Sequence, residues 1–117
     1  MADPSELLPL TPVVFHVLVA LADGDRHGYA IAREVERVTD GEIRMGPGTL
    51  YGSIQRMEAS GLIEESAPRA ADPAAERRRY YRITAFGRQA LRLESERLAR
   101  MVSLARSRNL IRDGGRA

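Results

Sequence analysis

The chain of 117 residues contains no cysteine, no lysine and no tryptophan. The absence of cysteine excludes a disulfide framework, a thiolate metal site and a cysteine nucleophile, and it is compatible with a reducing compartment. The N-terminal stretch MADPSELLPLTP lacks the basic and apolar regions of a secretory signal peptide. The longest apolar run, Val13–Ala22, is too short to span a bilayer. We therefore expect a single cytoplasmic domain with no membrane partner.

Aromatic and catalytic side chains are also scarce. Phe15 and Phe86 are the only phenylalanines, which argues against a large aromatic ligand pocket. His16 and His27 lie in different predicted elements, and no carboxylates are spaced around them as metal ligands would be. The segment GPGTLYG lacks the context and the lysine of a nucleotide-binding loop. Because no nucleophile, base and acid can be combined, we expect no enzyme, no metal and no cofactor.

Charge is distributed unevenly along the chain. Residues 1–76 contain 6 Arg and 13 acidic residues, a net charge of −7, whereas residues 77–117 contain 12 Arg and 3 acidic residues, a net charge of +9. A basic C-terminal third favours a polyanion or an acidic protein surface as partner. Mutual neutralisation of the two halves within a dimer is the alternative, and the two interpretations do not exclude each other.

The first two helices are predicted from their ends and their apolar spacing. Thr11 and Pro12 are typical of an N-cap and a first helical residue, and the helix runs from there to about Ala22. Because this helix is apolar nearly all round, both of its faces need cover, which is a first indication of a dimer. Residues 29–41 have one apolar stripe, and Gly41 is a C-terminal stop signal.

The third helix combines a clear apolar pattern with poor helix formers. Leu50, Ile54 and Met57 repeat at i, i+4 and i+7, and Gly61 is placed to end the helix. Three glycines fall in the same segment: Gly46, Gly48 and Gly52. Glycine costs about 1 kcal/mol relative to alanine inside a helix, so their presence needs a reason.

The face opposite the apolar stripe is small or polar. A helical wheel places Gly48, Gly52, Gln55, Arg56 and Ala59 there, with Thr49 and Ser53 on one flank and Tyr51 on the other. Small residues would let the helix lie deep in a DNA major groove, where Arg56 can pair with guanine and Gln55 with adenine. The three flanking hydroxyls suit phosphate oxygens. A surface helix that is merely polar is the alternative.

A β-hairpin is predicted after the third helix. Residues 62–67 and 77–84 are typical of strands, and the Pro- and Ala-containing segment 68–76 between them is expected to be a long, mobile tip. Residues 42–44 are a further candidate for a very short strand. Three helices followed by a hairpin are typical of a winged helix, in which the basic cluster Arg77, Arg78 and Arg79 would meet DNA phosphates. A solvated strand edge is the alternative for this cluster.

The last helix is predicted to begin after the N-cap Thr84 and to run to roughly Ile111. A helix of about 25 residues projects beyond a small domain, so its apolar stripe needs a partner, most simply the same helix of a second copy. The residues expected at this dimer interface are Phe15, Leu91, Leu98, Met101, Val102 and Ala105. Phe15, His16 and Met101 are candidates for a small effector cavity between subunits, with ordinary dimer core as the alternative.

Three segments occur together in a familiar order: HGYAIAREV at 27–35, GPGTLYGSIQRMEASGLI at 46–63 and RRRYYRITAFGRQAL at 77–91. In these segments the sequence resembles the PadR family of bacterial transcriptional regulators. The resemblance implies a homodimer with an N-terminal winged helix domain, which usually represses transcription and often releases DNA on binding a small molecule or sensing stress. It places Tyr51 near a phosphate and Arg77–Arg79 in a basic wing strand. Gly52 departs from the pattern, because many members have Pro there.

The sequence therefore predicts a mainly α protein with a small β-hairpin wing, namely a winged helix-turn-helix domain plus one long C-terminal helix. The expected parts are an N-terminal arm at 1–10, the DNA-binding domain at 11–84, a dimerisation helix at 85–111 and a frayed tail at 112–117. We expect a homodimeric, ligand- or stress-responsive repressor that binds a palindromic operator in double-stranded DNA. The alternatives are a winged helix protein-interaction module without specific DNA binding and a small-molecule-binding dimer with vestigial DNA binding.

Overall fold

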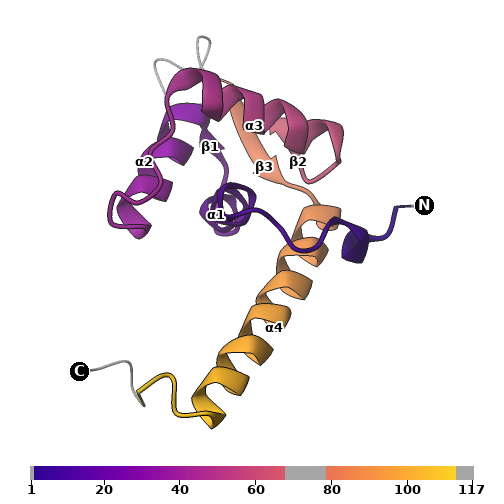
Figure 1. Cartoon of the computed structure of the whole chain (residues 1–117). Coiled ribbons are helices and arrows are strands. Elements are labelled where there is room, and N and C mark those ends of the chain that lie inside the picture. Colours follow the sequence, from indigo (N-terminus) through magenta and orange to yellow (C-terminus); the bar gives the residue numbers. More distant parts are fainter. Residues whose placement is uncertain (1, 68–78, 113–117) are drawn as a thin grey trace.

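The four long helices and the two strands of the hairpin follow one another in the order that the apolar patterns predict. The computed structural model describes residues 2–67 and 79–112 (Figure 1). Its elements are a short 3-10 helix η1 (Pro4–Leu7), α1 (Pro12–Leu21), β1 (Arg26–His27), α2 (Gly28–Val38), α3 (Pro47–Ala59), β2 (Ile63–Ser66), β3 (Tyr80–Ile83) and α4 (Ala85–Ser107). The fold class, mainly helical with a small sheet, is confirmed. The predicted hairpin tip, Arg77, Arg78 and the tail from residue 113 lie outside the described residues.

Local side-chain caps fix where the helices begin. The hydroxyl of Thr11 caps α1 and that of Thr84 caps α4, each by accepting a hydrogen bond from a backbone N–H of the first turn. The Nδ1 atom of His27 accepts the N–H of Ala30 at 3.1 Å and so caps α2. Gly61 ends α3 with φ +79°, as predicted. These positions were predictable because each signal acts over one helical turn.

Two helix ends differ from the prediction. Helix α2 ends at Val38, before Gly41, because Asp40 already adopts a left-handed φ of 56°. Helix α4 ends at Ser107 and not near Ile111, since Asn109 has φ 61° and the N–H of Leu110 turns back to the carbonyl of Ala105 at 3.0 Å. Asparagine and aspartate tolerate this conformation better than most residues.

The strand prediction was wrong in one place and incomplete in another. Residues 42–44 form no strand. Instead Arg26 and His27, which lie between the first two predicted helices, form β1 and pair antiparallel with Tyr81 and Tyr80 of β3. The sheet therefore has three strands in the order β1-β3-β2. A two-residue strand has no signal of its own, because it exists only through pairing with a distant strand.

Helix α1 is the centre of the core, and α2, α3, α4 and the sheet surround it (Figure 1). Val17 and Leu18 are fully buried, and the predicted α3 stripe packs in the same cluster. Val19, however, is 39% exposed. Only Val17, Leu18, Ala20 and Leu21 of this helix are buried, and Val13–His16 are half-buried, so a single chain covers α1 only in part.

The N-terminal arm is docked on the first half of α4. Leu7 and Leu10 pack against the core, and the N–H of Leu10 donates to the carboxylate of Glu94 at 2.9 Å. Glu94 is only 2% exposed, and it also accepts two hydrogen bonds from the guanidinium of Arg97. The hydrogen bonds from Arg97, together with the one from Leu10, lower the pKa of this carboxyl. A buried charge thus anchors residues 3–10 to α4.

The second half of α4 projects from the rest of the chain (Figure 1). The radius of gyration is 16.0 Å, whereas a compact domain of this length would have about 13 Å. On this part of the helix Met101 is 52%, Val102 42% and Leu104 57% exposed. The described chain offers nothing that covers these side chains. No helix among the described residues is long and apolar enough to cross a membrane.

Candidate nucleic-acid interface

Helix α3 separates its residues into a buried and an outward face, largely as the wheel predicted. Leu50, Ile54 and Met57 are buried against the core. The outward face consists of Gly48, Thr49, Tyr51, Gln55, Arg56 and Ala59, all exposed, and of Gly52, which is half-buried. Gln55 and Arg56 therefore stand next to Gly48, Gly52 and Ala59, which have little or no side chain.

Ser53 is the exception, and the expectation that it lies on an exposed flank was wrong. It is 4% exposed and lies on the core side of α3. Its position three residues after Leu50 falls within the arc that α1, α2 and β2 cover, which is wider than the stripe of large apolar residues. The Ser53 hydroxyl accepts a hydrogen bond from Nη2 of Arg56 at 3.2 Å. The hydroxyl of Ser53 therefore affects the outward face only by holding the side chain of Arg56.

The glycines of α3 are not required by packing. A Cβ atom added at Gly46 or Gly48 would meet no other atom within 4 Å, and one at Gly52 would meet only Nη1 of Arg56, at 3.5 Å. The surroundings of all three glycines therefore leave room for a side chain. The fold therefore gives no reason for glycine at these three positions.

Two other glycines show what a packing requirement looks like. A Cβ atom at Gly87 would collide with the carbonyl oxygen of Leu62, and one at Gly28 would lie 2.8 Å from Oη of Tyr51. Glycine is needed at Gly87 because the backbone of Leu62 approaches it closely, whereas a side chain at Gly28 would displace the ring of Tyr51. By contrast, the bare surface of α3 faces away from the rest of the described chain.

Tyr51 connects α3 to the start of α2. Its ring lies over Gly28, the first residue of α2, and the side chain remains 46% exposed. The His27 and Tyr29 rings are stacked next to it, with centroids 6.4 Å apart and planes 4° apart. A cavity of about 520 Å³ between α3, the start of α2 and β3 is lined in part by these aromatic rings and by Tyr81. Burial raises the pKa of Tyr81.

The arginines of the wing that the structure describes are paired with acids. Nε of Arg82 lies 2.8 Å from Oε2 of Glu64, its direct neighbour across the hairpin. Nε of Arg79 lies 4.0 Å from Oε1 of Glu65. The predicted basic cluster is thus partly neutralised at Arg79, while Arg77 and Arg78 lie outside the described residues.

The predicted dimer and effector residues fall on two helices. Phe15 and His16 meet edge-on on α1 with ring centroids 5.4 Å apart, and the buried Nδ1 of His16 has no hydrogen-bond partner among the described residues. On α4, Met101 accepts a bond from Arg97 at 3.1 Å. Three further predicted interface residues are half-buried on α4: Leu91, Leu98 and Ala105. No group of three or more His, Asp or Glu side chains within the described ranges could hold a metal ion.

The three-helix core, the hairpin and the bare third helix define a winged helix protein of the helix-turn-helix class. Residues 17–93 match the PadR-like family of transcriptional regulators, and the chain belongs to this family. It is 42% identical over 93 residues to the transcriptional regulator Rv3488 of Mycobacterium tuberculosis, across 77% of this chain and 81% of that protein. It is also 40% identical over 85 residues to an uncharacterised 37.1 kDa protein in transposon TN4556 of Streptomyces fradiae, across 73% of this chain but only 22% of that protein.

Solved structures share the fold. A PadR family transcription regulator from Clostridium difficile superimposes with a TM-score of 0.68 at 22% identity, covering 83% of this chain and 97% of that one. PadR of Bacillus subtilis, solved in complex with operator DNA, superimposes with a TM-score of 0.59 at 19% identity, covering 72% of this chain and 45% of that one. At these identities the likeness establishes the winged helix fold.

Proposed function

We propose that this PadR-like regulator binds double-stranded DNA by inserting α3 into the major groove. The observation that carries the proposal is the bare outward face of α3, where packing within the described chain does not require glycine at Gly48 and Gly52. A helix with small residues on its outward face can approach base edges closely, and the exposed Arg56 and Gln55 supply the donors and acceptors that read them. The operator complex of Bacillus subtilis PadR supports this use of the fold.

The remaining site residues have backbone roles in this proposal. Thr49 and Tyr51 are exposed on α3, and their hydroxyls suit phosphate oxygens that flank the groove. Arg77–Arg79 would contact phosphates from the wing. Ser53 has a different part: its hydroxyl holds Arg56 at 3.2 Å and so limits the directions in which the guanidinium can point.

The active form in this proposal is a homodimer joined through α4. Exposed Met101, Val102 and Leu104 lie within one turn of a projecting helix, where a second copy of the same helix would bury them. Two α3 helices would then read two half-sites about one helical turn apart in a palindromic operator. Repression is the expected outcome, because a protein bound across an operator excludes other proteins from it.

A second candidate function is the binding of a small-molecule effector between the two subunits. The observation that favours it is the buried Nδ1 of His16, which lacks a partner within the described chain and lies beside Phe15. Buried polar atoms are usually satisfied, so a group from a partner subunit or a small molecule would complete it. Thermal shift against a metabolite panel, compared between wild type and His16→Phe, tests this candidate.

Titration of DNA binding with variants of α3 and the wing tests the main proposal. The operator is first obtained by selecting bound fragments from genomic DNA. Arg56→Ala should then weaken operator binding by about 1–3 kcal/mol and relax preference at one base position. Arg79→Ala should weaken binding to all sequences alike.

Two outcomes would contradict the assigned roles. If Arg56→Ala and Arg79→Ala change specific and nonspecific binding in the same way, α3 does not read bases. If the wild-type protein binds no genomic fragment at low salt, the winged helix serves protein interaction instead of DNA binding.

A further inference from the structure

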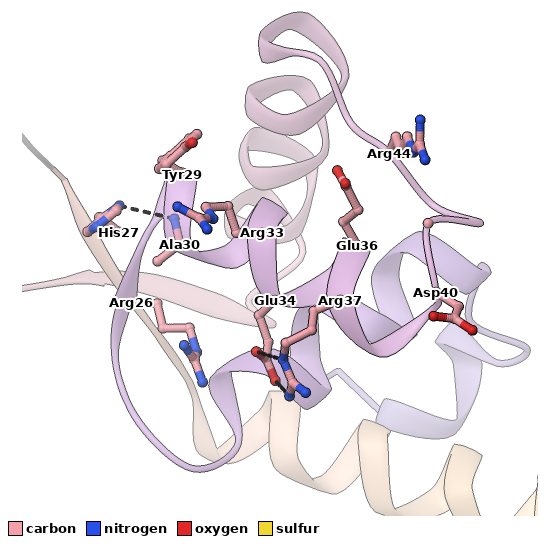
Figure 2. A pocket seen from close by; sticks show the side chains of 11 residues that line it. Arg26, His27, Tyr29, Ala30, Arg33, Glu34, Glu36, Arg37, Asp40 and Arg44 are labelled. Atoms are coloured by element: carbon pink, nitrogen blue, oxygen red, sulfur yellow. Dashed lines mark hydrogen bonds and ion pairs between the residues drawn. The ribbon is translucent and has the colours of Figure 1, made fainter.

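A strip of side chains next to α3 was not among the predicted contacts. Tyr29 and Arg33 lie one turn apart on α2, and Arg44 comes from the loop between α2 and α3. All three border a groove of about 1180 Å³ on the outer side of α2 (Figure 2). The guanidinium of Arg33 lies 5.6 Å from the centroid of the Tyr29 ring. The guanidinium of Arg44 lies next to Gly41, where an added Cβ would be 3.0 Å from its Nη2. We refer to Tyr29, Arg33 and Arg44 as the α2 strip.

The two arginines of the α2 strip differ from their neighbours in having no acidic partner in the part of the chain that the structure describes. Arg37, one turn after Arg33, forms two hydrogen bonds of 3.0 and 2.9 Å with the carboxylate of Glu34. Arg26 lies 3.8 Å from Asp23 and donates to a backbone carbonyl. Within residues 2–67 and 79–112, Arg33 and Arg44 form no ion pair. Their positive charge is therefore available to an external anion.

The α2 strip lies at the side of the proposed reading helix. Tyr51 of α3 packs on Gly28, which precedes Tyr29, and Arg44 is three residues before Pro47, where α3 begins. In Figure 2, Tyr29 and Arg44 point to the side on which α3 lies, whereas the Glu34–Arg37 pair points the opposite way. Arg44 therefore places a basic group close to the start of α3.

We propose that the α2 strip holds the phosphodiester backbone along one edge of the major groove that α3 enters. This inference rests on the proposed DNA binding and adds a backbone contact that does not depend on the wing. In a helix-turn-helix, the helix before the reading helix crosses the backbone, and Arg33 and Arg44 place two uncompensated guanidinium groups there. The described wing arginines, in contrast, share their charge with Glu64 and Glu65.

One acidic side chain in the same groove should act in the opposite direction. Glu36 lies one turn after Arg33 and points to the α3 side (Figure 2). Its carboxylate would repel a phosphate backbone that runs along the α2 strip. Substitutions at Glu36 and at the strip arginines should therefore change affinity with opposite signs.

The test uses DNA without an operator, because backbone contacts do not depend on sequence. Fluorescence anisotropy measures binding of the full chain to a labelled mixed-sequence duplex of about 30 base pairs between about 50 and 200 mM salt. Arg33→Gln and Arg44→Gln should each lower the slope of log affinity against log salt by about 0.9 for each phosphate that is no longer neutralised, and weaken binding about threefold or more. Glu36→Gln should strengthen binding. Arg37→Gln is the matched control on the same helix and should leave slope and affinity unchanged.

Different experimental results would contradict this inference and the proposed function. If wild-type protein binds the duplex with a salt slope, but Arg33→Gln and Arg44→Gln behave like Arg37→Gln, the α2 strip does not touch the backbone and DNA binding itself stands. If wild-type protein shows no salt-dependent binding, DNA binding and the inference fail together. All substituted side chains are on the surface, and circular dichroism checks that each variant is folded.

Discussion

The outward face of α3 and the second half of α4 are both left uncovered by the described chain, but their chemistry is opposite. The face of α3 carries Gly48, Gly52 and the polar heads of Gln55 and Arg56, and its one large exposed ring, that of Tyr51, rests in part on Gly28. The second half of α4 instead exposes large apolar side chains such as Leu104. A surface of the first kind loses little by staying in water, whereas one of the second kind gains by burial.

The comparison separates two reasons for exposure. Where a residue has no side chain, as at Gly48, a rigid partner can approach the helix backbone closely. The polar base edges in a DNA groove are a partner of this kind. Where side chains are large, flexible and apolar, as at Met101, a second protein surface of similar character fits. Substitutions that change one of these properties at a time test the distinction.

Giving the α3 face a large side chain should have the largest effect. Gly52→Leu leaves the core untouched, because a Cβ there meets only Arg56 at an ordinary contact distance. The isobutyl group would hold the helix off the groove, so operator affinity should fall to the nonspecific level, a loss of about 4 kcal/mol. Gel-shift titration measures the loss, and circular dichroism confirms the fold. Unchanged affinity in a folded variant would mean that the glycines have another cause.

Giving the α4 face charge should abolish the dimer. Met101→Asp combined with Val102→Asp places two carboxylates where the second copy would pack, so light scattering should report a monomer. Operator affinity should fall about a hundredfold, because two half-sites are no longer engaged together. Gln89→Asp adds charge at an exposed position on the first half of α4 and should remain dimeric. A double variant that stays dimeric would place the interface elsewhere.

Releasing the arm from the first half of α4 should have an intermediate effect on stability. Glu94→Gln weakens the bonds to Arg97 and Leu10, and should lower the free energy of unfolding by about 1–3 kcal/mol at neutral pH. The folded-state pKa of Glu94 is lowered, so the carboxylate stabilises the protein above the unfolded-state pKa of about 4.3 and loses this effect as pH falls through the lower folded value.

The pH dependence distinguishes this role from simple packing. The difference in unfolding free energy between wild type and Glu94→Gln should shrink as pH falls below about 4. Urea denaturation at several pH values measures it. A difference that is the same at all pH values would show that the charge of Glu94 contributes nothing.

Filling the α3 face with a single methyl group should have the smallest effect and the opposite sign. Gly52→Ala should raise the free energy of unfolding by about 0.5–1 kcal/mol, because alanine is a better helix former and the site has room. Gly87→Ala is the control and should destabilise, since its methyl group would meet the carbonyl of Leu62. Thermal denaturation compares them. A loss of stability in Gly52→Ala would show that the fold does need this glycine.

Much of the fold was predictable because its signals are local. Thr84 caps a helix through a hydrogen bond within one turn, and Gly61 ends one through its own backbone angle. Leu50, Ile54 and Met57 share a face for any helix of this pitch, so their burial followed from spacing alone. The small outward face, including Gly48 and Arg56, followed from the same wheel.

Apart from the ends of α2 and α4, the features that the sequence did not reveal depend on contacts between distant segments. The burial of Ser53 depends on how wide an arc of α3 is covered by α1, α2 and β2. The anchoring role of Glu94 depends on Leu10, 84 positions earlier. Neither contact leaves a periodic or short-range pattern in the chain.

By itself, the sequence determined which segments are helices, which face of each is apolar, and which helix could read DNA, because these follow from backbone preference and side-chain spacing within a few residues. Only the tertiary structure decided that Arg26 and His27 complete the sheet and that Tyr51 rests on Gly28. It also decided which arginines keep a free charge, since Arg33 and Arg37 look alike in the sequence until Glu34 pairs with one of them. The spacing of three residues that joins Glu34 to Arg37 also separates Arg33 from Glu36, so spacing allows either pair. Only the positions of the side chains in the folded chain decide which of the two pairs forms.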